Sequence, residues 1–266
     1  MAKRYRNSLI LRPLPPRPRS ALAAWAVRVA LFVPVFAVIS LLAYRSGSVD
    51  EAVLRALVWI VLAVALLGIV LVVGALRSLW VYGTRGGRQT IFAILLLIPT
   101  LTPYAAAAFL AAAMPHQSDV STDLVNPPMF RSEIESENVN RPALVAATLG
   151  DGYASLTGRR YRAAPDAIEA TVLAVADTSG WRLETRRGRA SADDELFFQF
   201  ENRIPVLGLP AQMVLRITDE GDSSFVDLRG RVLHVSHDLG WNARVIERYL
   251  QTLDYELVAI ADVEPI

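Results

Sequence analysis

The chain has 266 residues, 53% of them hydrophobic, and contains no cysteine. This apolar fraction is too high for an ordinary soluble domain and indicates a membrane protein. The lack of cysteine excludes disulfides, thiolate metal sites and a cysteine nucleophile. The net charge of +1 hides an asymmetry, because residues 1–115 hold 12 basic and 2 acidic side chains whereas residues 116–266 hold 15 and 24. A basic, apolar half and an acidic, polar half suggest two parts in two environments.

Residues 1–20 form a basic leader, and three apolar stretches follow over residues 21–44, 56–76 and 91–114. Each stretch is long enough to cross a bilayer, which needs about 20 residues. We therefore predict a three-helix transmembrane domain over residues 21–115, with the lipid bilayer as its partner.

The short flanks of these stretches predict the orientation. The leader and the second loop, RSLWVYGTRGGRQ, carry arginines without an acid, whereas the first loop around RSGSVDE is mixed. The positive-inside rule places the leader and the second loop in the cytoplasm, so three crossings place everything after Met114 on the far side. Arginine greatly outnumbers lysine, as in GC-rich bacterial genomes, and we predict a bacterial inner-membrane protein with a cytoplasmic N-terminus and a periplasmic C-terminal domain. Topology explains the cations of the leader, and no nucleic-acid partner is expected.

The composition becomes polar from His116 onward. Residues 116–158 lack strong periodicity and are interpreted as an irregular lead-in. Residues 159–256 are interpreted as the folded domain and residues 257–266 as a C-terminal tail. In the domain, Pro165 opens a helix that Gly180 ends.

Alternating and aromatic-rich runs predict four strands, and an apolar stripe predicts a final helix. The strands cover 181–185, 195–203, 213–218 and 225–234, with an additional strand at 160–163 left open, and the helix covers about 239–253.

Consecutive strands joined by short turns form an antiparallel meander. The predicted fold class is three transmembrane α-helices followed by an α+β two-layer domain, an antiparallel four-stranded sheet with two helices on one face. The other sheet face would then be polar, because Asp227, Arg229 and Arg231 alternate with apolar residues in the last strand.

Four segments of this half, taken in order, resemble the DUF1499 family. They are DVSTDLVNPPMF at 119–130, GW at 180–181, VDLRGRV at 226–232 and DLGWNARVIERYL at 238–250. Together they cover roughly residues 119–253. The family is one of unknown function, so the resemblance implies domain boundaries and export but no activity.

The chain departs from the family pattern at two places. Where the family usually has an Asp-Asp pair before its third strand, this chain has Ala211 and Gln212. Where the family has Arg-Ser-x-Ser-Arg-Val-Gly, residues 229–235 read RGRVLHV. A site built on those acids or serines would lack them here.

Residues 229–244, RGRVLHVSHDLGWNAR, contain the most chemically suggestive pattern. Amides at a helix N-terminus beside guanidinium groups resemble a receptor for phosphate or carboxylate, since arginine binds oxyanions through two donors. The ligand-binding residues predicted on this basis are Arg229, Arg231, His237 and Arg244.

Two other interpretations use the same stretch. It can be a strand–helix joint in which Ser236 or Asp238 caps the final helix, or a metal site formed by His234, His237 and Asp238. Residues 234 and 237 point to opposite faces of a continuing strand, and nearby arginines would repel a dication. The structural joint is therefore preferred, and no metal, catalytic residue or cofactor is predicted.

Three classes of function remain open from the sequence. The first is a non-enzymatic envelope protein whose periplasmic domain binds a protein partner or a small anionic ligand, and it is preferred. The second is a periplasmic hydrolase, with or without a metal, acting at the 229–244 surface. The third is a structural subunit of a membrane complex.

Overall fold

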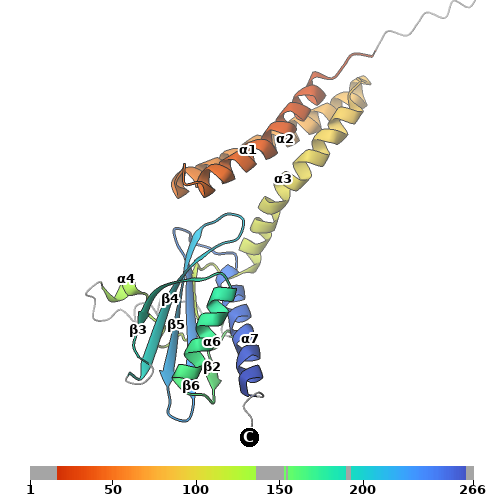
Figure 1. Cartoon of the computed structure of the whole chain (residues 1–266). Coiled ribbons are helices and arrows are strands. Elements are labelled where there is room, and N and C mark those ends of the chain that lie inside the picture. Colours follow the sequence, from red (N-terminus) through yellow and green to blue (C-terminus); the bar gives the residue numbers. More distant parts are fainter. Residues whose placement is uncertain (1–16, 136–152, 154, 190–192, 262–266) are drawn as a thin grey trace, which may run out of the picture. The chain divides into compact units, whose positions relative to one another are not determined.

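The computed structural model describes residues 17–135, 153, 155–189 and 193–261. Most of the basic leader, much of the lead-in and the end of the C-terminal tail lie outside the described residues. The chain divides into two compact units, Met1–Tyr104 and Ala105–Ile266, whose elements are labelled in Figure 1.

The first unit is built from the first two of the three apolar helices that the sequence predicts and from most of the third, whose end belongs to the second unit. They are α1 (Ala21–Arg45), α2 (Glu51–Tyr82) and α3 (Gly87–Ala113), and each is long and apolar enough to cross a membrane. The helix that the sequence placed at 56–76 begins earlier, because the Asp50 side chain accepts a hydrogen bond from the Val53 amide and caps α2. Small residues let the helices approach closely, and a Cβ at Gly68 would lie 3.0 Å from the Leu97 side chain.

The end of the leader lies beside the loop between α2 and α3. The Ser20 amide donates to the Arg85 carbonyl at 2.9 Å, and the Arg85 amide donates to the Pro18 carbonyl at 2.9 Å. Two segments that carry arginine without acid therefore share one end of the helical unit.

The second unit contains one antiparallel sheet of six strands, two more than the sequence predicted. Its order is β1-β6-β5-β4-β3, and β2 pairs with β6 beside this path. The strands are β1 (Asp119–Ser121), β2 (Arg159–Tyr161), β3 (Arg182–Arg187), β4 (Glu195–Arg203), β5 (Pro210–Asp219) and β6 (Ser224–Val232).

The two additional strands pair with opposite ends of β6. Residues 119–121 pair with 229–231, and residues 159–161 pair with 224–226. A strand of three residues is too short to show a period of two, so β1 was hidden in what the sequence indicated to be an irregular lead-in. The β2 strand corresponds to the segment left open at 160–163.

Two long helices share a core with the sheet. They are α6 (Pro165–Thr178) and α7 (Trp241–Ala261), and α7 continues eight residues beyond the Leu253 end that the sequence predicted. Their apolar stripes pack with the side chains on one face of β4, β5 and β6. The fully buried members include Ile168, Val172, Phe198, Phe200, Met213, Leu215, Val226, Leu228, Ile246 and Leu250.

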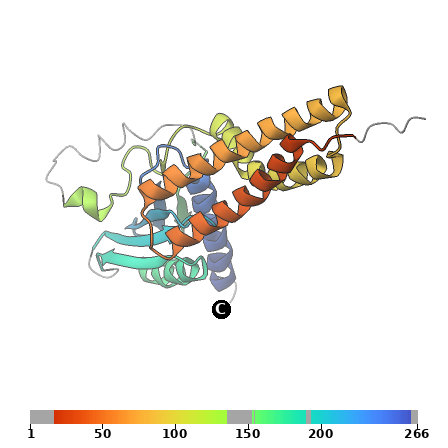
Figure 2. The ribbon, with the colours of Figure 1, turned by 90° about the horizontal axis from the view of Figure 1, so that it is seen from above.

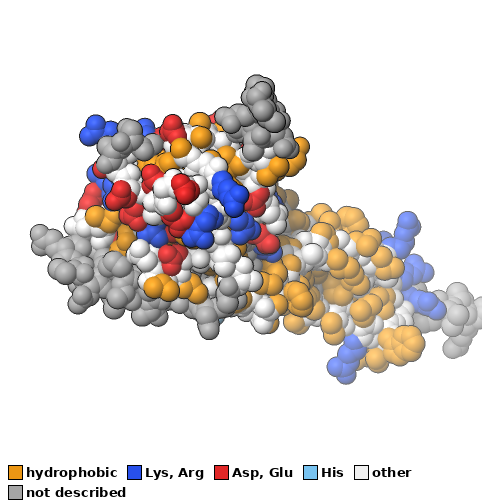
Figure 3. Space-filling model, turned by 90° about the horizontal axis from the view of Figure 1, so that it is seen from below, with side chains coloured by type: hydrophobic (Ala, Val, Ile, Leu, Met, Phe, Trp, Pro, Cys, Tyr) orange, Lys and Arg blue, Asp and Glu red, His pale blue; other side chains and the backbone are white. Residues whose placement is uncertain are grey.

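Residues 119–135, which we call the cover segment, begin as the strand β1 beside β6 and then cross the opposite face of the sheet. The segment also contains the short helix α4 (Arg131–Ile134). Seen from above, α4 lies on one side of the strands and α6 on the other (Figure 2). The outer surface of the domain mixes acids with arginines in the view of Figure 3, whereas hydrophobic side chains dominate the visible surface of the helices.

Candidate functional site

The cover segment lies on a set of side chains that we call the polar face. The strand register aligns them in rows across the sheet, since residues paired between strands point to the same side. One row joins Arg187, Phe197, Arg216 and Asp227, and the neighbouring row joins Thr185, Gln199, Val214 and Arg229.

Arg229 is buried between two carboxylates of the cover segment. Its guanidinium donates to Asp119 at 2.7 and 2.8 Å and to Glu133 at 2.9 Å through both terminal nitrogens. The group lies 4.8 Å from the centre of the Phe130 ring, and the residue is only 1% exposed. Burial by itself lowers the pKa of Arg229, but the hydrogen bonds and charges of Asp119 and Glu133 raise it. Arg229 therefore holds the cover segment on the sheet.

Arg216 holds a second point of the same segment. It donates to Asp227 on β6, to the Asp123 carboxylate at 3.2 Å and to the Asn126 carbonyl at 2.9 Å. Asp227 is completely buried, and this burial raises its pKa to about 6 although Arg216 acts in the opposite direction. The two arginines and their acids form a polar network between cover segment and sheet.

Arg231 extends this network at the edge of the cover segment. Its guanidinium donates to the Gln212 side chain at 2.7 Å and to the Ser132 hydroxyl at 2.9 Å. It also lies 3.9 Å from the Phe130 ring centre. Arg229 and Arg231, both predicted as ligand-binding residues, thus contact residues of this chain in the structure.

The other two predicted ligand-binding residues lie at the strand–helix joint. The His237 Nδ1 accepts a hydrogen bond from the Leu239 amide, and its Nε2 lies 3.2 Å from the Ala111 carbonyl. Since Nδ1 accepts, the proton belongs on Nε2, which then donates to Ala111. Arg244 donates to the Leu239 carbonyl at 3.0 Å. The structure does not place these two residues in the network around Arg229 and Arg231.

The Asp238 carboxylate has the geometry of a helix cap. It accepts the Gly240 amide and the Asn242 amide, each at 2.8 Å, at the start of α7. No hydrogen bond of the Ser236 side chain is found among the described residues. His234 has a φ of +62° and is exposed. The described part of the chain holds no group of three His, Cys, Asp or Glu residues that could bind a metal ion, so His234, His237 and Asp238 do not form one.

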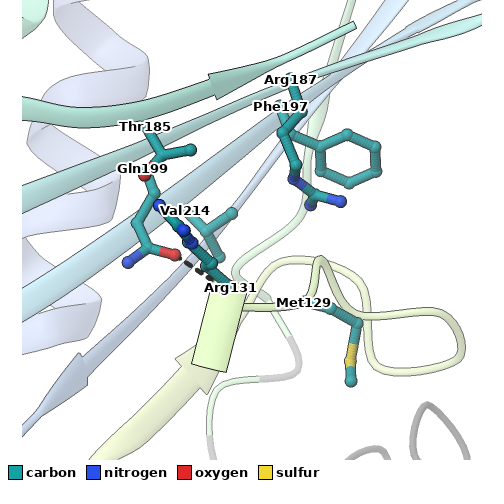
Figure 4. Close-up of a pocket in the computed structure, with 7 residues that line it drawn as sticks. All are labelled: Met129, Arg131, Thr185, Arg187, Phe197, Gln199 and Val214. Carbon is teal, nitrogen blue, oxygen red and sulfur yellow. Dashed lines mark hydrogen bonds between the residues drawn. The ribbon is translucent and has the colours of Figure 1, made fainter. Parts of the chain in front are cut away.

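A hollow lies on the polar face beside the network. It is a shallow depression with a cavity volume of about 10 Å³, and it lies between β3, β4, β5 and the cover segment, as Figure 4 shows. Its lining residues are Met129, Arg131, Thr185, Arg187, Phe197, Gln199 and Val214.

Two polar groups of this hollow differ from those of the network. The Thr185 hydroxyl is buried and has no hydrogen-bond partner among the described residues. The Arg187 guanidinium lies 4.4 Å from the Phe197 ring centre, and no salt bridge involves it in the part of the chain that the structure describes. Burial lowers the pKa of Arg187, with Glu195 acting in the opposite direction. Among the described residues, the lining of the hollow therefore includes an arginine that makes no salt bridge and a buried hydroxyl that makes no hydrogen bond.

Sequence reasoning missed Thr185 and Arg187 as site residues. A β-bulge between Leu183 and Thr185 changes the register of β3, and Leu183 is 44% exposed. Strict alternation from Trp181 places Leu183 and Thr185 on the same face and cannot reveal this change. The only available signal was an arginine two residues after a threonine in a strand.

Fold and site together define a class of protein: three apolar helices that can span a membrane, followed by an α+β domain whose polar face is closed by its own N-terminal segment. A family model described as a protein of unknown function (DUF1499) matches residues 119–253. The chain belongs to this family, as its motifs predicted. No curated protein matches the chain. The matched region begins at β1, so the cover segment is part of the family domain.

Proposed function

We propose that this chain is an inner-membrane-anchored binding protein of the bacterial envelope whose domain lies in the periplasm. In this proposal the domain does not catalyse a reaction but binds a small anionic group, either free or on a partner, in the hollow between Thr185 and Arg187. The observation that carries the proposal is that, among the described residues, this partly desolvated arginine makes no salt bridge and lies on the same strand as a buried hydroxyl that has no hydrogen-bond partner.

The orientation follows from the arrangement of the basic segments. The end of the leader, residues 17–20, and the α2–α3 loop lie side by side at one end of the helical unit, and both belong to segments that carry arginine without acid. Basic segments of this kind stay in the cytoplasm. Three crossings then direct the chain after α3 to the periplasm.

The chemistry of the hollow favours an oxyanion. A guanidinium can give two parallel hydrogen bonds to a carboxylate or phosphate, and a nearby hydroxyl adds a third donor. The Phe197 ring on which Arg187 lies fixes the direction of that group. By contrast, Arg216 and Arg229 already have acidic partners and would have to lose them to bind a ligand.

Two alternatives receive less support. A hydrolase at the 229–244 surface would use His237 and Asp238, but their ring and carboxylate bind neighbouring backbone amides. A structural subunit of a membrane complex would use its spans, and no feature of the described residues favours this role over binding.

The proposal is tested by anion titration of the full-length protein in lipid nanodiscs. Inorganic phosphate and acetate are titrated in parallel, with binding followed by calorimetry. We expect Arg187→Gln to weaken binding of the preferred anion by about tenfold or more, since a hydrogen bond to a charged group contributes about 1.5–3 kcal/mol. Thr185→Val should weaken it less, because a neutral hydroxyl is lost.

The matched control is Arg182→Gln on the same strand, because Arg182 is 77% exposed and already pairs with Glu201. It should leave anion binding unchanged. Equal loss of binding in the control, or no binding of either anion by the unmodified protein, would contradict the proposal.

A further inference from the structure

The loop between β4 and β5 carries an uncharged, apolar sequence. Residues 204–209 read IPVLGL, and Val206 and Leu207 at its tip are 68% and 40% exposed. The corresponding turn between β5 and β6, residues 220–223, reads EGDS and is polar. Exposed apolar side chains are costly in water, so one loop with two of them at its tip indicates a contact with something apolar.

The backbone of this loop is largely satisfied from within. The Ile204 amide donates to the Leu209 carbonyl at 2.9 Å, and the Gly208 amide donates to the Ile204 carbonyl at 2.8 Å. The Arg203 guanidinium donates to the Gly208 carbonyl at 3.3 Å. Internal pairing of this kind reduces the cost of moving backbone groups out of bulk water.

The loop lies at the end of the sheet to which the last apolar helix is attached. Ala211 at the start of β5 pairs with Val232 at the end of β6, and the Val232 amide donates to the Ser118 carbonyl. Ser118 lies only five residues after the end of α3. Within the unit that begins at Ala105, the loop and the end of α3 therefore lie at one end of the domain (Figure 1).

The tip also keeps a residue that its backbone disfavours. Val206 has a φ of +70°, a conformation that β-branched side chains rarely adopt and that glycine adopts freely. A strained backbone at an exposed valine is consistent with a binding role for its side chain.

From these observations we propose that the β4–β5 loop inserts Val206 and Leu207 into the surface of the bilayer that holds the spans. The domain then contacts the membrane at two points, the end of α3 and this loop. This contact involves neither the hollow nor its anion, so it does not rest on the proposed binding function.

The test uses the absence of cysteine in the chain. Leu207→Cys is labelled with an environment-sensitive fluorophore in the full-length protein, which is reconstituted into phosphatidylglycerol-containing vesicles. The matched control is Asp222→Cys in the β5–β6 turn at the opposite end of the sheet. We expect the label at 207 to be quenched severalfold more strongly than the label at 222 by lipids that carry a nitroxide near the headgroup, and less strongly by aqueous iodide.

Two results would overturn the proposal. One is equal iodide quenching at both positions, which would place the loop in water. The other is protection from iodide without quenching by nitroxide lipids, which would mean that protein covers the loop.

A second variant separates membrane contact from folding. In the Leu207→Cys background, Val206→Gly removes the apolar side chain and also relieves the backbone at φ +70°. We expect weaker quenching by nitroxide lipids without any fall in the unfolding temperature. Unchanged quenching would show that the valine makes no contact with lipid.

Discussion

Arg229 and Arg187 carry the same guanidinium group in opposite surroundings. Arg229 has two carboxylates and is 1% exposed, whereas Arg187 lies on an aromatic ring beside a hydroxyl without a partner. Because a buried charge without a partner is costly, the first arginine is committed to the fold. The second, which makes no salt bridge among the described residues, is the one that we propose binds a ligand. The sequence drew attention to Arg229 and not to Arg187. A pattern of residue types shows neither which charges pair in the fold nor where a β-bulge lies.

The role of Arg229 is tested by Arg229→Met. The substitution leaves Asp119 and Glu133 without their shared cation. We therefore expect the free energy of unfolding to fall by about 3 kcal/mol. This value is at the lower end of the range for breaking a buried ion pair, because Asp119 is partly exposed. Hydrogen exchange should rise first in β1. Arg160→Gln, which breaks a surface salt bridge to Glu220, is the control and should leave β1 protected. Normal protection of β1 in Arg229→Met would show that the arginine does not hold the cover segment.

Burial of Asp227 predicts how the stability of the fold depends on pH. Its folded pKa of about 6 lies above its ordinary value of 3.8, so the folded state binds this proton more tightly than the unfolded state. Proton binding by Asp227 therefore stabilises the folded state. This stabilisation is complete below about pH 4 and is lost as the pH rises through about 6. It contributes up to about 3 kcal/mol to the free energy of unfolding.

In Asp227→Asn this contribution to the pH dependence is absent. Urea unfolding of the detergent-solubilised protein at a series of pH values should therefore show the variant gaining stability relative to the unmodified protein between about pH 4 and about pH 7. A relative loss of stability over that range would mean that the ionised pair with Arg216 is favourable overall.

At the scale of elements, helices and strands with a regular apolar pattern were predictable from the sequence, whereas short or irregular strands were not. The bounds of β4, 195–203, and the Pro165 start of α6 match the predictions, because strong alternation and a proline at a helix start are local signals. The β1 strand exists only because residues 119–121 pair with the end of β6, which is more than 100 residues away. The salt bridges of the polar face depend on that pairing. The sequence therefore indicated the arginines of this face but not the cover segment that lies on them.

The strand–helix joint is also an element with a testable role. Asp238→Ala removes the acceptor of two amides at the start of α7, and we expect a loss of about 1 kcal/mol, with faster hydrogen exchange in the first turn of the helix. Ser236→Ala is the matched control two residues away and should have no effect. If both substitutions act equally, the carboxylate is not the cap.

At the scale of the whole molecule, the separation of charge follows the division into units. The described end of the basic leader lies beside the α2–α3 loop at one end of the helical unit, and the acidic half of the chain contains the domain that belongs to the DUF1499 family. The proposed orientation explains both features, because arginine-rich loops remain in the cytoplasm and an acidic domain is not restrained in the same way. Binding of an anion in the hollow would then occur in the periplasm.

The most direct test of this account is the location of the domain. A phosphatase reporter that is active only outside the cytoplasm is fused after Ile266, and the same reporter is fused after Thr84 in the α2–α3 loop. We predict activity for the fusion after Ile266 and none for the fusion after Thr84. Activity only for the fusion after Thr84 would place the domain in the cytoplasm and contradict the account.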